Sequence, residues 1–539
     1  MKLRTILVVA TVTGMALATG GWLLQRETAP VGSVYQQARL FEDVLAHVAD
    51  FYVDSVDEHR LYQMAIDGML DQLHDPYSVF LKRDDFRNLT EQTTGNYGGL
   101  GIQIDVRDGW ITVVAPLLDT PAERVGIQSA DQIIALDGRS TEGWKQDQAV
   151  KELRGQPGTP VELKVRRVGV EQPLTFKLTR ATIHVRSVQV AMMLDDKVGF
   201  VVLNTVSETS ADELTQAVGD LVKKGMKSLV LDLRGNPGGL LDQGVGVSEL
   251  FLDPGQEVVS TRGRAPLSTR TFRDTKPQLW PGLPVVVLVN GGTASAAEII
   301  SGALQDHDRA VIVGTPTFGK GLVQSLWQLT PETALKLTTA RWYTPSGRTI
   351  QRKSKNEQEQ VAQAEAAELG RDTTKLDSSL VFHTDRGRVV IGSGGIRPDL
   401  FIVPDTFTTA ERTFMKALGN KIPVFRDVLS TYALELKATN KLPSPSFTVT
   451  DEMVNEVLRR MRARGVGVAD TVVAGARPLL AQELGYEAAR YVFGRSSEVR
   501  RRMDEDRQVR AALALAHRAK SPEDLLAIAA AQAPRTPRN

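Results

Sequence analysis

The chain has 539 residues, enough for about three or four domains at roughly 150 residues each. Hydrophobic residues make up 42% and charged residues 24%, as in ordinary globular proteins, which excludes collagen-like and wholly disordered chains. Its 65 Lys and Arg residues nearly balance 64 Asp and Glu residues, and a net charge of +1 does not attract the chain to nucleic acid. The absence of cysteine excludes disulfides, thiolate metal sites and cysteine nucleophiles.

Residues 1–24 have the pattern of an export signal. Lys2 and Arg4 precede an apolar run from Ile6 to Leu24 that is just long enough to span a bilayer. The small residues at 16–18 offer a cleavage site, so a removed signal peptide and a retained membrane anchor both stay open; a buried core helix is the third interpretation. The positive flank favours a position outside the cytoplasm for the rest of the chain.

A small helical N-terminal unit is predicted over residues 34–94. Apolar residues recur at helical spacing over Val34–Val53 and again over Leu61–Leu73. The pair Asp75-Pro76 predicts a turn that ends the second helix.

Residues 95–170 change to a mostly β pattern, in which a glycine-rich loop at 98–101 leads into an alternating strand. Short strands are predicted over Trp110–Val114, Ile133–Leu136 and Val161–Arg166, a helical turn over Thr120–Val125 and a helix over Asp147–Leu153.

Residues 195–350 alternate between strand and helix, which predicts an α/β domain. The strands are expected over Gly199–Leu203, Ser228–Leu233, Pro284–Asn290 and Ala310–Val313, and the helices over Ala211–Lys224, Leu240–Leu250 and Ala294–Gln305. A stretch rich in Gln, Glu and Ala at 355–368 indicates an exposed insertion, and the chain becomes strongly helical from about residue 408.

The glycine-rich loop is a candidate peptide-binding site. Successive amides over Gly99–Ile102 form a nest that suits a chain-terminal carboxylate, while the peptide adds as a strand to the following sheet edge. A plain β-turn is the alternative. Residues 97–167 resemble a PDZ domain in their succession of loop, strands and helix, although Ser129-Ala130-Asp131 stands where that family usually has Ala-Gly-Asp. The resemblance implies that Gly99, Leu100, Gly101 and Ile102 bind a peptide carboxyl terminus.

Ser295 is a candidate nucleophile, because it follows the predicted strand ending at Asn290 and precedes an apolar helix. Amides at the start of a helix favour negative charge, which an attacked carbonyl develops. A plain helix cap is the alternative interpretation.

The base for such a serine is expected to be Lys320 and not a histidine. His307 lies at the far end of the helix that begins near Ser295, roughly 15 Å away at 1.5 Å per residue, and is expected to cap that end. Lys320 lies between glycines in an apolar loop, where Phe318, Leu322 and Val323 offer apolar walls. Such burial would lower the pKa of a lysine from its ordinary value of about 10.4, as a base requires. A solvated surface lysine is the alternative.

Taken together, these motifs resemble the carboxyl-terminal processing peptidases, also called tail-specific proteases. That family has a serine–lysine–glutamine constellation, matched by Ser295 in Gly-Thr-Ala-Ser-Ala-Ala-Glu, Lys320 in Phe-Gly-Lys-Gly, and Gln324. The segments Asp232–Gly239 and Asp75–Ser78 match further family motifs, and the similarity covers about residues 35–403.

The resemblance implies roles residue by residue. Ser295 is the nucleophile, Lys320 is the general base and later the proton donor, and Gln324 orients Lys320. The amides of Gly238, Gly239 and Ala296 are the candidates for the oxyanion hole. No metal or organic cofactor is called for.

The implied fold is a multidomain α+β chain. A helical N-terminal unit (34–94) and a mostly β PDZ domain (95–170) precede an α/β (crotonase/ClpP-like) protease core at 171–407, which carries an insertion at 353–380. A helical C-terminal extension follows at 408–539, for which intramolecular packing, a dimer contact and an adaptor surface are all open.

The implied function is that of a serine endopeptidase that cleaves proteins near a free C-terminus through an acyl-enzyme, after the PDZ domain binds the terminal carboxylate. We expect it in the bacterial periplasm or on the extracytoplasmic face of the inner membrane. Membrane association through the N-terminal segment and a homo-oligomer stay open, and no nucleic-acid partner is expected. The alternatives are an inert PDZ scaffold and an enzyme of the enoyl-CoA hydratase-like architecture.

Overall fold

The computed structural model describes residues 34–167, 169–352 and 380–532. The export pattern at 1–24 and nearly all of the insertion predicted at 353–380 lie outside the described residues. The chain divides into a first unit, Met1–Arg83 with Gln324–Thr338, and a second unit, Asp84–Val323 with Thr339–Asn539. Within the described ranges, no helix combines the length and apolar character that crossing a bilayer requires.

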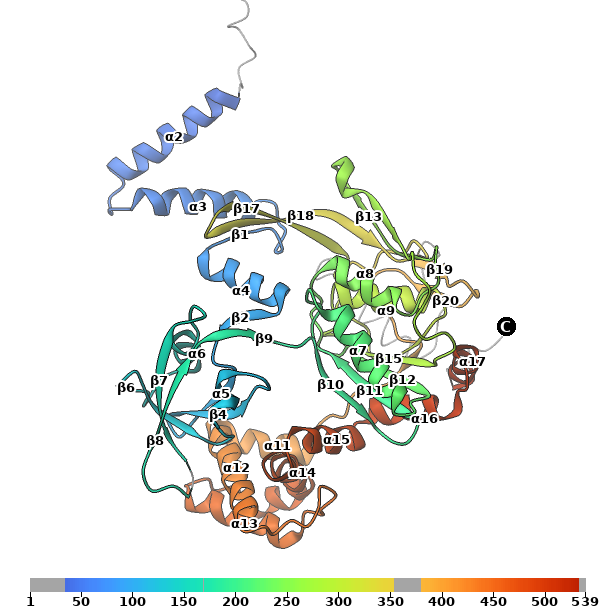
Figure 1. Ribbon diagram of the computed structural model, residues 1–539. Helices are drawn as coiled ribbons and strands as arrows, with labels where there is room; N and C mark the ends of the chain where they lie inside the picture. The colour runs from blue at the N-terminus through green and yellow to red at the C-terminus, as the bar shows by residue number, and fades with distance from the viewer. Residues whose placement is uncertain (1–33, 168, 353–379, 533–539) are drawn as a thin grey trace, which may run out of the picture. The chain divides into compact units, whose positions relative to one another are not determined.

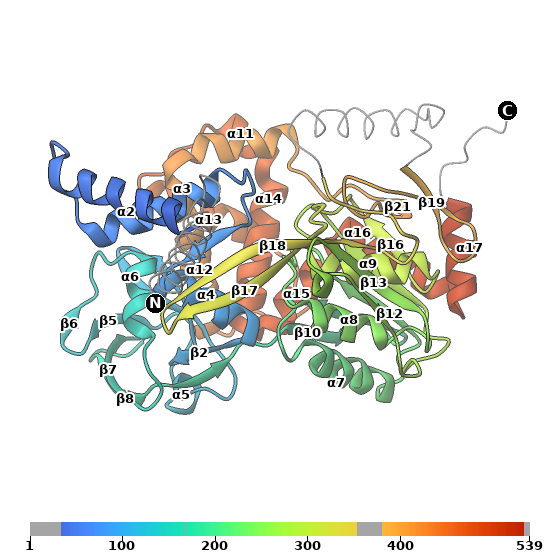
Figure 2. The same ribbon diagram turned by 90° about the horizontal axis from the view of Figure 1, so that it is seen from above.

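The first unit contains the two predicted helices, α2 (Val34–Phe51) and α3 (Glu58–Asp71), and a short strand, β1 (Val79–Leu81). Strand β1 pairs antiparallel with residues 334–336 of β18 (Thr333–Tyr343), which also pairs with β17 (Leu322–Thr330; Figure 2). The predicted turn at 75–78 is closed by its own side chains, because Ser78 Oγ donates to Asp75 Oδ2 at 2.5 Å. Ser78 Oγ in turn accepts the Thr338 N–H at 3.0 Å, so this motif anchors β18 within the unit.

The second unit begins with α4 and the predicted β module. A sheet with the order β3-β4-β5-β7-β8 packs on the helices α5 and α6 around a common apolar core. These elements are α4 (Arg83–Thr94), β2 (Asn96–Gly99), β3 (Ile102–Arg107), β4 (Trp110–Pro116), α5 (Pro121–Arg124), β5 (Gln132–Leu136), β6 (Arg139–Ser140), α6 (Gln146–Leu153), β7 (Pro160–Arg166), β8 (Leu174–Thr179) and β9 (Ala181–His184). Strand β2 pairs separately with β9.

The α/β part of the second unit is a six-stranded sheet with the order β10-β11-β12-β15-β16-β21, parallel except for β10. Its strands are β10 (Val188–Met193), β11 (Val198–Leu203), β12 (Ser228–Asp232), β15 (Val285–Val289), β16 (Val311–Gly314) and β21 (Leu400–Phe401). The four predicted strands correspond to β11, β12, β15 and β16, and the three predicted helices to α7 (Ser210–Lys223), α8 (Leu241–Glu249) and α9 (Ala296–Asp306).

Both faces of this sheet are buried, which explains why its strands are uninterrupted apolar runs. Alternate residues enter two different cores: Leu229 and Leu231 of β12 join the core with α7, α8 and α9, whereas Val230 joins the opposite core. That second core is completed by α16 (Arg507–Arg518) and α17 (Pro522–Gln532), which lie against the sheet in Figure 1. The end of the predicted helical extension therefore forms one layer of the α/β fold.

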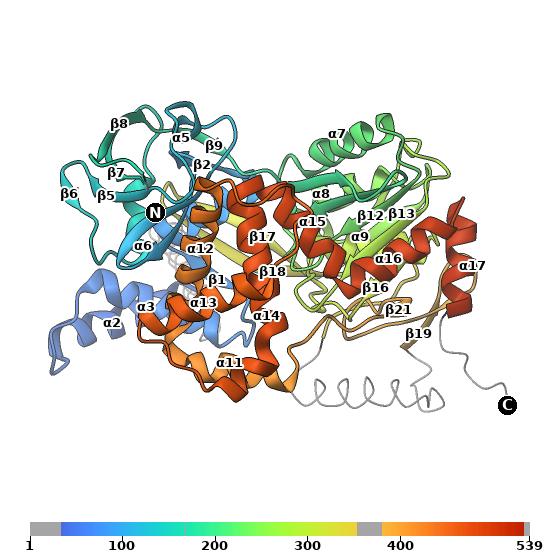
Figure 3. The same ribbon diagram turned by 90° about the horizontal axis from the view of Figure 1, so that it is seen from below.

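The rest of the extension forms a helical cluster of its own (Figure 3). It consists of α11 (Thr409–Leu418), α12 (Ile422–Ala438), α13 (Asp451–Ala463), α14 (Asp470–Ala488), a π-helical turn (Ala489–Phe493) and α15 (Arg495–Glu505). The helical prediction from residue 408 onward is confirmed, but its helices divide between two cores.

Further strand pairings accompany the α/β sheet in the second unit. Strand β13 (Glu257–Gly263) pairs with β14 (Arg270–Arg273) and with residues 340–343 of β18, and β19 (Val381–His383) pairs with β20 (Val389–Ile391).

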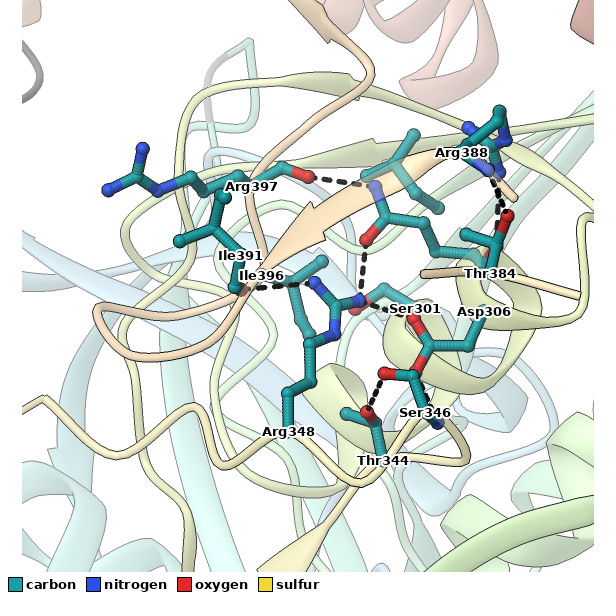
Figure 4. A network of polar contacts seen from close by, with 12 residues as sticks. Ser301, Asp306, Thr344, Ser346, Arg348, Thr384, Arg388, Ile391, Ile396 and Arg397 are labelled. Carbon is teal, nitrogen blue, oxygen red and sulfur yellow. Dashed lines mark hydrogen bonds and ion pairs between the residues drawn. The ribbon is translucent and has the colours of Figure 1, made fainter. Parts of the chain in front are cut away.

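A buried polar network fixes the C-terminal end of α9 (Figure 4). The fully buried Arg348 donates from Nη2 to Asp306 Oδ1 at 2.6 Å and to Gln305 Oε1 at 2.8 Å. Its Nη1 donates to the Ile391 carbonyl at 3.2 Å, which ties β20 to the helix. Arg388 bridges Asp308 and Asp399 at 2.5 Å each, so the hairpin β19–β20 is held at several points.

Candidate active site

Ser295 lies in the turn between β15 and α9, where the sequence predicts a strand–turn–helix junction. It is the N-cap residue of α9 and has φ 54° and ψ −119°. A positive φ is uncommon for a residue with a side chain, and such strain concentrates at functional sites. The backbone thus holds this serine in a conformation that a plain helix cap does not need.

The turn before Ser295 is bonded to the turn after β12. Asn290 Oδ1 accepts the N–H groups of Gly235 and Gly292, both at 2.9 Å. The Ala294 N–H donates to the Asn236 carbonyl at 2.9 Å. Since β12 and β15 are neighbouring parallel strands, their C-terminal ends meet at one sheet edge, which brings the segment 234–239 next to Ser295.

Gly238 lies close against Ser295. A Cβ atom on Gly238 would lie 2.8 Å from the Ser295 Cβ and 2.8 Å from the Ala296 nitrogen. Only glycine fits here, and its φ of +87° also favours glycine. The Gly238 N–H is already engaged, because it donates to Asn236 Oδ1 at 2.8 Å.

Gly239 and Ala296 carry the available amides. The Gly238 carbonyl accepts the Val206 N–H at 3.0 Å, and because a trans peptide points its N–H the opposite way, the Gly239 N–H faces away from Val206. Among the described residues, neither the Gly239 nor the Ala296 N–H has a hydrogen-bond partner. Of the two candidate glycines, Gly239 therefore offers the unpaired donor.

The Ser295 and Lys320 loops are joined by Glu298, a fully buried residue that the sequence reasoning missed. Glu298 Oε2 accepts the Ser295 N–H at 2.8 Å and the Lys320 N–H at 2.9 Å. Its Oε1 accepts the Thr317 hydroxyl at 2.5 Å and the Gly319 N–H at 2.7 Å. One carboxylate therefore connects the two predicted catalytic positions through their backbones. The Ser-x-x-Glu spacing, typical of a capping box, is the sequence signal that points to it.

Burial dominates the electrostatics of Glu298. It raises the pKa of this carboxyl above its ordinary value, and the hydrogen bonds from Thr317, Lys320 and Gly319 oppose that rise. Four hydrogen-bond donors surround the group, so the carboxylate acts as an acceptor that fixes two loops.

The backbone of Lys320 is held from both sides. Its N–H donates to Glu298, and its carbonyl accepts the indole N–H of the buried Trp342 at 3.0 Å. The preceding Phe318 N–H donates to the Thr293 carbonyl at 2.9 Å, a second direct link between the loops. Lys320 itself is half-buried, whereas Phe318, predicted as an apolar wall, is 46% exposed.

Gln324 and His307 each have hydrogen-bond partners of their own. Gln324 is on β17 and belongs to the first unit, where its Nε2 lies 3.5 Å from Thr338 Oγ1, so its predicted contact with Lys320 stays a prediction. His307 is the C-cap of α9, as predicted, and hydrogen-bonds Asp385 and the Glu257 carbonyl, both at 2.7 Å.

The predicted peptide-binding loop lines a cavity of about 100 Å³. Gly99, Leu100, Gly101 and Ile102 form one side, and the others are lined by Tyr97, Ile104, Val150, Leu153 and Arg154. Val150 and Leu153 come from α6, whose helical spacing was visible in the sequence, although their place in the groove was missed. Most of the lining residues are apolar, which suits a peptide that ends in an apolar residue.

Three family models and several curated proteins match this chain. Family models match for peptidase family S41 at residues 197–360, for a PDZ domain at 89–166, and for the N-terminal domain of the activating protease CtpB at 23–85. The carboxy-terminal-processing protease of Bartonella bacilliformis is 42% identical over 323 residues, which cover 59% of this chain and 74% of that protein. The chain belongs to peptidase family S41. It is thus a serine-type peptidase of the carboxy-terminal processing group with a PDZ domain.

Two further relatives are similar. The carboxy-terminal processing protease CtpA of Bacillus subtilis is 38% identical over 302 residues, covering 56% of this chain and 64% of that protein. Among solved structures, the photosystem II D1 C-terminal processing protease is 29% identical with a TM-score of 0.34, covering 59% of this chain and 90% of that one.

Proposed function

We propose that this S41 peptidase cleaves exported proteins near their carboxyl termini through an acyl-enzyme on Ser295. The main supporting observation is that the Glu298 carboxylate accepts hydrogen bonds from the backbone of both Ser295, which has a strained conformation, and Lys320. The unpaired amides of Gly239 and Ala296 lie next to Ser295. Export is supported by the basic and apolar pattern of residues 1–24, which favours the bacterial periplasm or the outer face of the inner membrane.

In the proposed mechanism, the neutral amine of Lys320 takes the proton of the Ser295 hydroxyl while Oγ attacks the scissile carbonyl. The N–H groups of Gly239 and Ala296 stabilise the oxyanion of the tetrahedral intermediate, and Gly238 contributes by letting the segment 234–239 lie close against Ser295. The Lys320 ammonium then protonates the leaving amine as the C–N bond breaks. Lys320 then takes a proton from a water molecule that attacks the ester carbonyl, the ester C–O bond breaks, and Lys320 returns the proton to Ser295 Oγ. The family resemblance assigns Gln324 the role of orienting Lys320.

The PDZ domain is proposed to bind the substrate's terminal carboxylate. Gly99, Leu100, Gly101 and Ile102 line a cavity whose other lining residues are mostly apolar. The amides of a glycine-rich loop suit a terminal carboxylate, and an apolar lining suits an apolar last side chain. Substrates are therefore unstructured proteins with a free C-terminus.

Mass spectrometry of an unstructured protein incubated with the enzyme tests both parts. We expect cuts near the C-terminus, a loss of more than about a thousandfold in rate for Ser295→Ala and Lys320→Ala, and slower cutting of the same substrate with an amidated C-terminus. Wild-type rates in Ser295→Ala would refute the serine mechanism. Equal rates on the free and amidated chains would refute recognition of the carboxylate but would leave the serine mechanism untouched.

A further inference from the structure

Arg234 opens the segment that carries the proposed oxyanion donor, and the C-terminal extension holds it. The Arg234 side chain is only 15% exposed, and its Nε and Nη2 donate to Asp232 at 2.9 and 2.6 Å. Its Nη1 donates to Asp506 Oδ2 at 2.7 Å and to Gln508 Oε1 at 2.9 Å. All three guanidinium nitrogens are thus used, and Asp506 lies 272 positions farther along the chain.

Asp506 and Gln508 are themselves fixed. Asp506 is the N-cap of α16, and its Oδ1 accepts the N–H groups of Gln508 and Val509 at 2.8 and 3.0 Å, which leaves Oδ2 for Arg234. Gln508 is 1% exposed, and its Nε2 donates to the Ile402 carbonyl at 2.6 Å. The completely buried Val509 packs in the core under the sheet. The two acceptors therefore reach Arg234 in a preset geometry.

The charge on Arg234 depends on these partners. Burial by itself lowers the pKa of the guanidinium, but Asp232 and then Asp506 raise it above the ordinary value. Loss of the Asp506 charge would leave the largely buried Nη1 without an anionic acceptor, which is a costly state for a buried charge.

The residues after Arg234 are each anchored to the core in turn. Gly235 donates to Asn290, Asn236 Nδ2 donates to the Leu203 carbonyl at 2.7 Å, and Gly238 donates to Asn236. Arg234 is the first anchor in this series. Because oxyanion donors act only when held close to the position of the developing charge, a shift at the start of the segment weakens catalysis more than substrate binding.

We propose that Asp506 and Gln508 are positioning residues for catalysis: they hold Arg234, and through it the segment that presents the Gly239 amide to the oxyanion. The C-terminal extension is then part of the working enzyme and not only a partner-binding appendage. This inference rests on the proposed role of Gly239.

The chain offers a matched control. His517, at the other end of α16, contacts Asp195 through Nε2 at 2.7 Å, a tie between the same helix and the sheet that does not touch Arg234. Asp506→Asn keeps a good N-cap for the helix but removes the charge that faces Arg234. His517→Gln removes a more exposed tie of the same helix, with side chains 47% and 33% exposed against 15% and 22% for Arg234 and Asp506, and leaves the Arg234 contacts unchanged.

The experiment uses the full chain with active sites counted by a serine-reactive phosphonate. For Asp506→Asn we expect kcat per titrated site to fall about tenfold, with KM within about twofold and an unchanged pH profile of kcat/KM. His517→Gln should stay within about twofold of wild type in both constants. In an Arg234→Lys background, adding Asp506→Asn should have little further effect, because the two residues act as a unit.

Equal losses of kcat per titrated site in Asp506→Asn and His517→Gln would overturn the proposal. So would a loss in Asp506→Asn that appears only as fewer titrated sites, with kcat per site unchanged. Additive losses of kcat for Asp506→Asn and Arg234→Lys would also overturn it. Wild-type cleavage by Ser295→Ala would instead refute the proposed function itself, whatever the other variants do.

Discussion

At the scale of single residues, Gly238 has no room for a side chain. A Cβ there would lie 2.6 Å from the Ala294 carbonyl oxygen and 2.8 Å from the Ser295 Cβ. We predict that Gly238→Ala lowers kcat by about a hundredfold, because the added methyl group pushes the segment 234–239 away from Ser295. Steady-state kinetics with purified protein measures this.

Gly235→Ala is the matched control for that change. Gly235 also has a positive φ, of +70°, but a Cβ there would meet nothing within 4 Å. Its substitution should cost about 1 kcal/mol of stability through backbone strain and leave kcat within a few-fold of wild type. Equal losses of kcat in both variants would show that backbone strain, and not the collision with Ser295, causes the loss in Gly238→Ala.

Glu298 gives a second prediction at this scale. Glu298→Gln keeps one acceptor oxygen but turns an NH₂ group toward two of its donors, so one of the two loops must shift. We expect kcat to fall about ten- to a hundredfold. The variant should stay folded, because the glutamine side chain is neutral and puts no unpaired charge into the buried site. Kinetics and thermal unfolding, measured together, test this; an unchanged kcat would contradict the linking role.

The pH dependence of stability follows from the same carboxyl. Burial raises the pKa of Glu298 in the folded state above its value in the unfolded chain. Its contribution to the free energy of unfolding is therefore largest at pH values below the ordinary glutamate pKa, and it is lost as the pH rises through the raised folded-state pKa. The free energy of unfolding of the wild type should therefore fall relative to that of Glu298→Gln as pH rises through this window. Denaturant unfolding at several pH values measures it, and a difference that is independent of pH would be inconsistent with the assignment.

At the scale of elements, the buried network at the end of α9 holds the hairpin β19–β20. Arg348→Met leaves the carboxylate of Asp306, which is 1% exposed, without its cation. We predict a loss of about 3–5 kcal/mol in the free energy of unfolding, because a buried charge is left unpaired. Urea unfolding measures this loss.

Arg386→Gln serves as the comparison for the network. Arg386 pairs with Glu523 at 2.8 Å, but both side chains are more than half exposed. Its loss should cost no more than about 1 kcal/mol. A cost at Arg348→Met as small as that at Arg386→Gln would contradict the structural role of the network.

Elements differ in how well the sequence predicts them. The strands β11, β12, β15 and β16 are apolar runs because both faces of their sheet are covered, and helices α7 and α9 follow from apolar spacing. Strands β17 and β18 were not predicted, because residues such as Gln324, Ser325 and Lys336 interrupt their apolar pattern. No residue of β17 is fully buried, and β18 buries only three.

At the scale of the whole molecule, the order of domains could be predicted from the motifs, but long-range partners could not. Helix α16 is recognisable as a helix, yet nothing in its own residues shows that Val509 enters the core of a sheet or that Asp506 pairs with Arg234. The same holds for Glu298, whose local spacing indicates only a helix cap. Contacts between distant segments require the folded chain.

The central claim is that Ser295 becomes covalently modified with Lys320 as its base. Intact-mass and peptide mass spectrometry after reaction with a serine-reactive phosphonate tests it most directly. We predict one adduct, on Ser295, in the wild type, and at least a hundredfold slower labelling in a folded Lys320→Ala variant. An adduct on another residue, or labelling of Lys320→Ala at the wild-type rate, would contradict the claim.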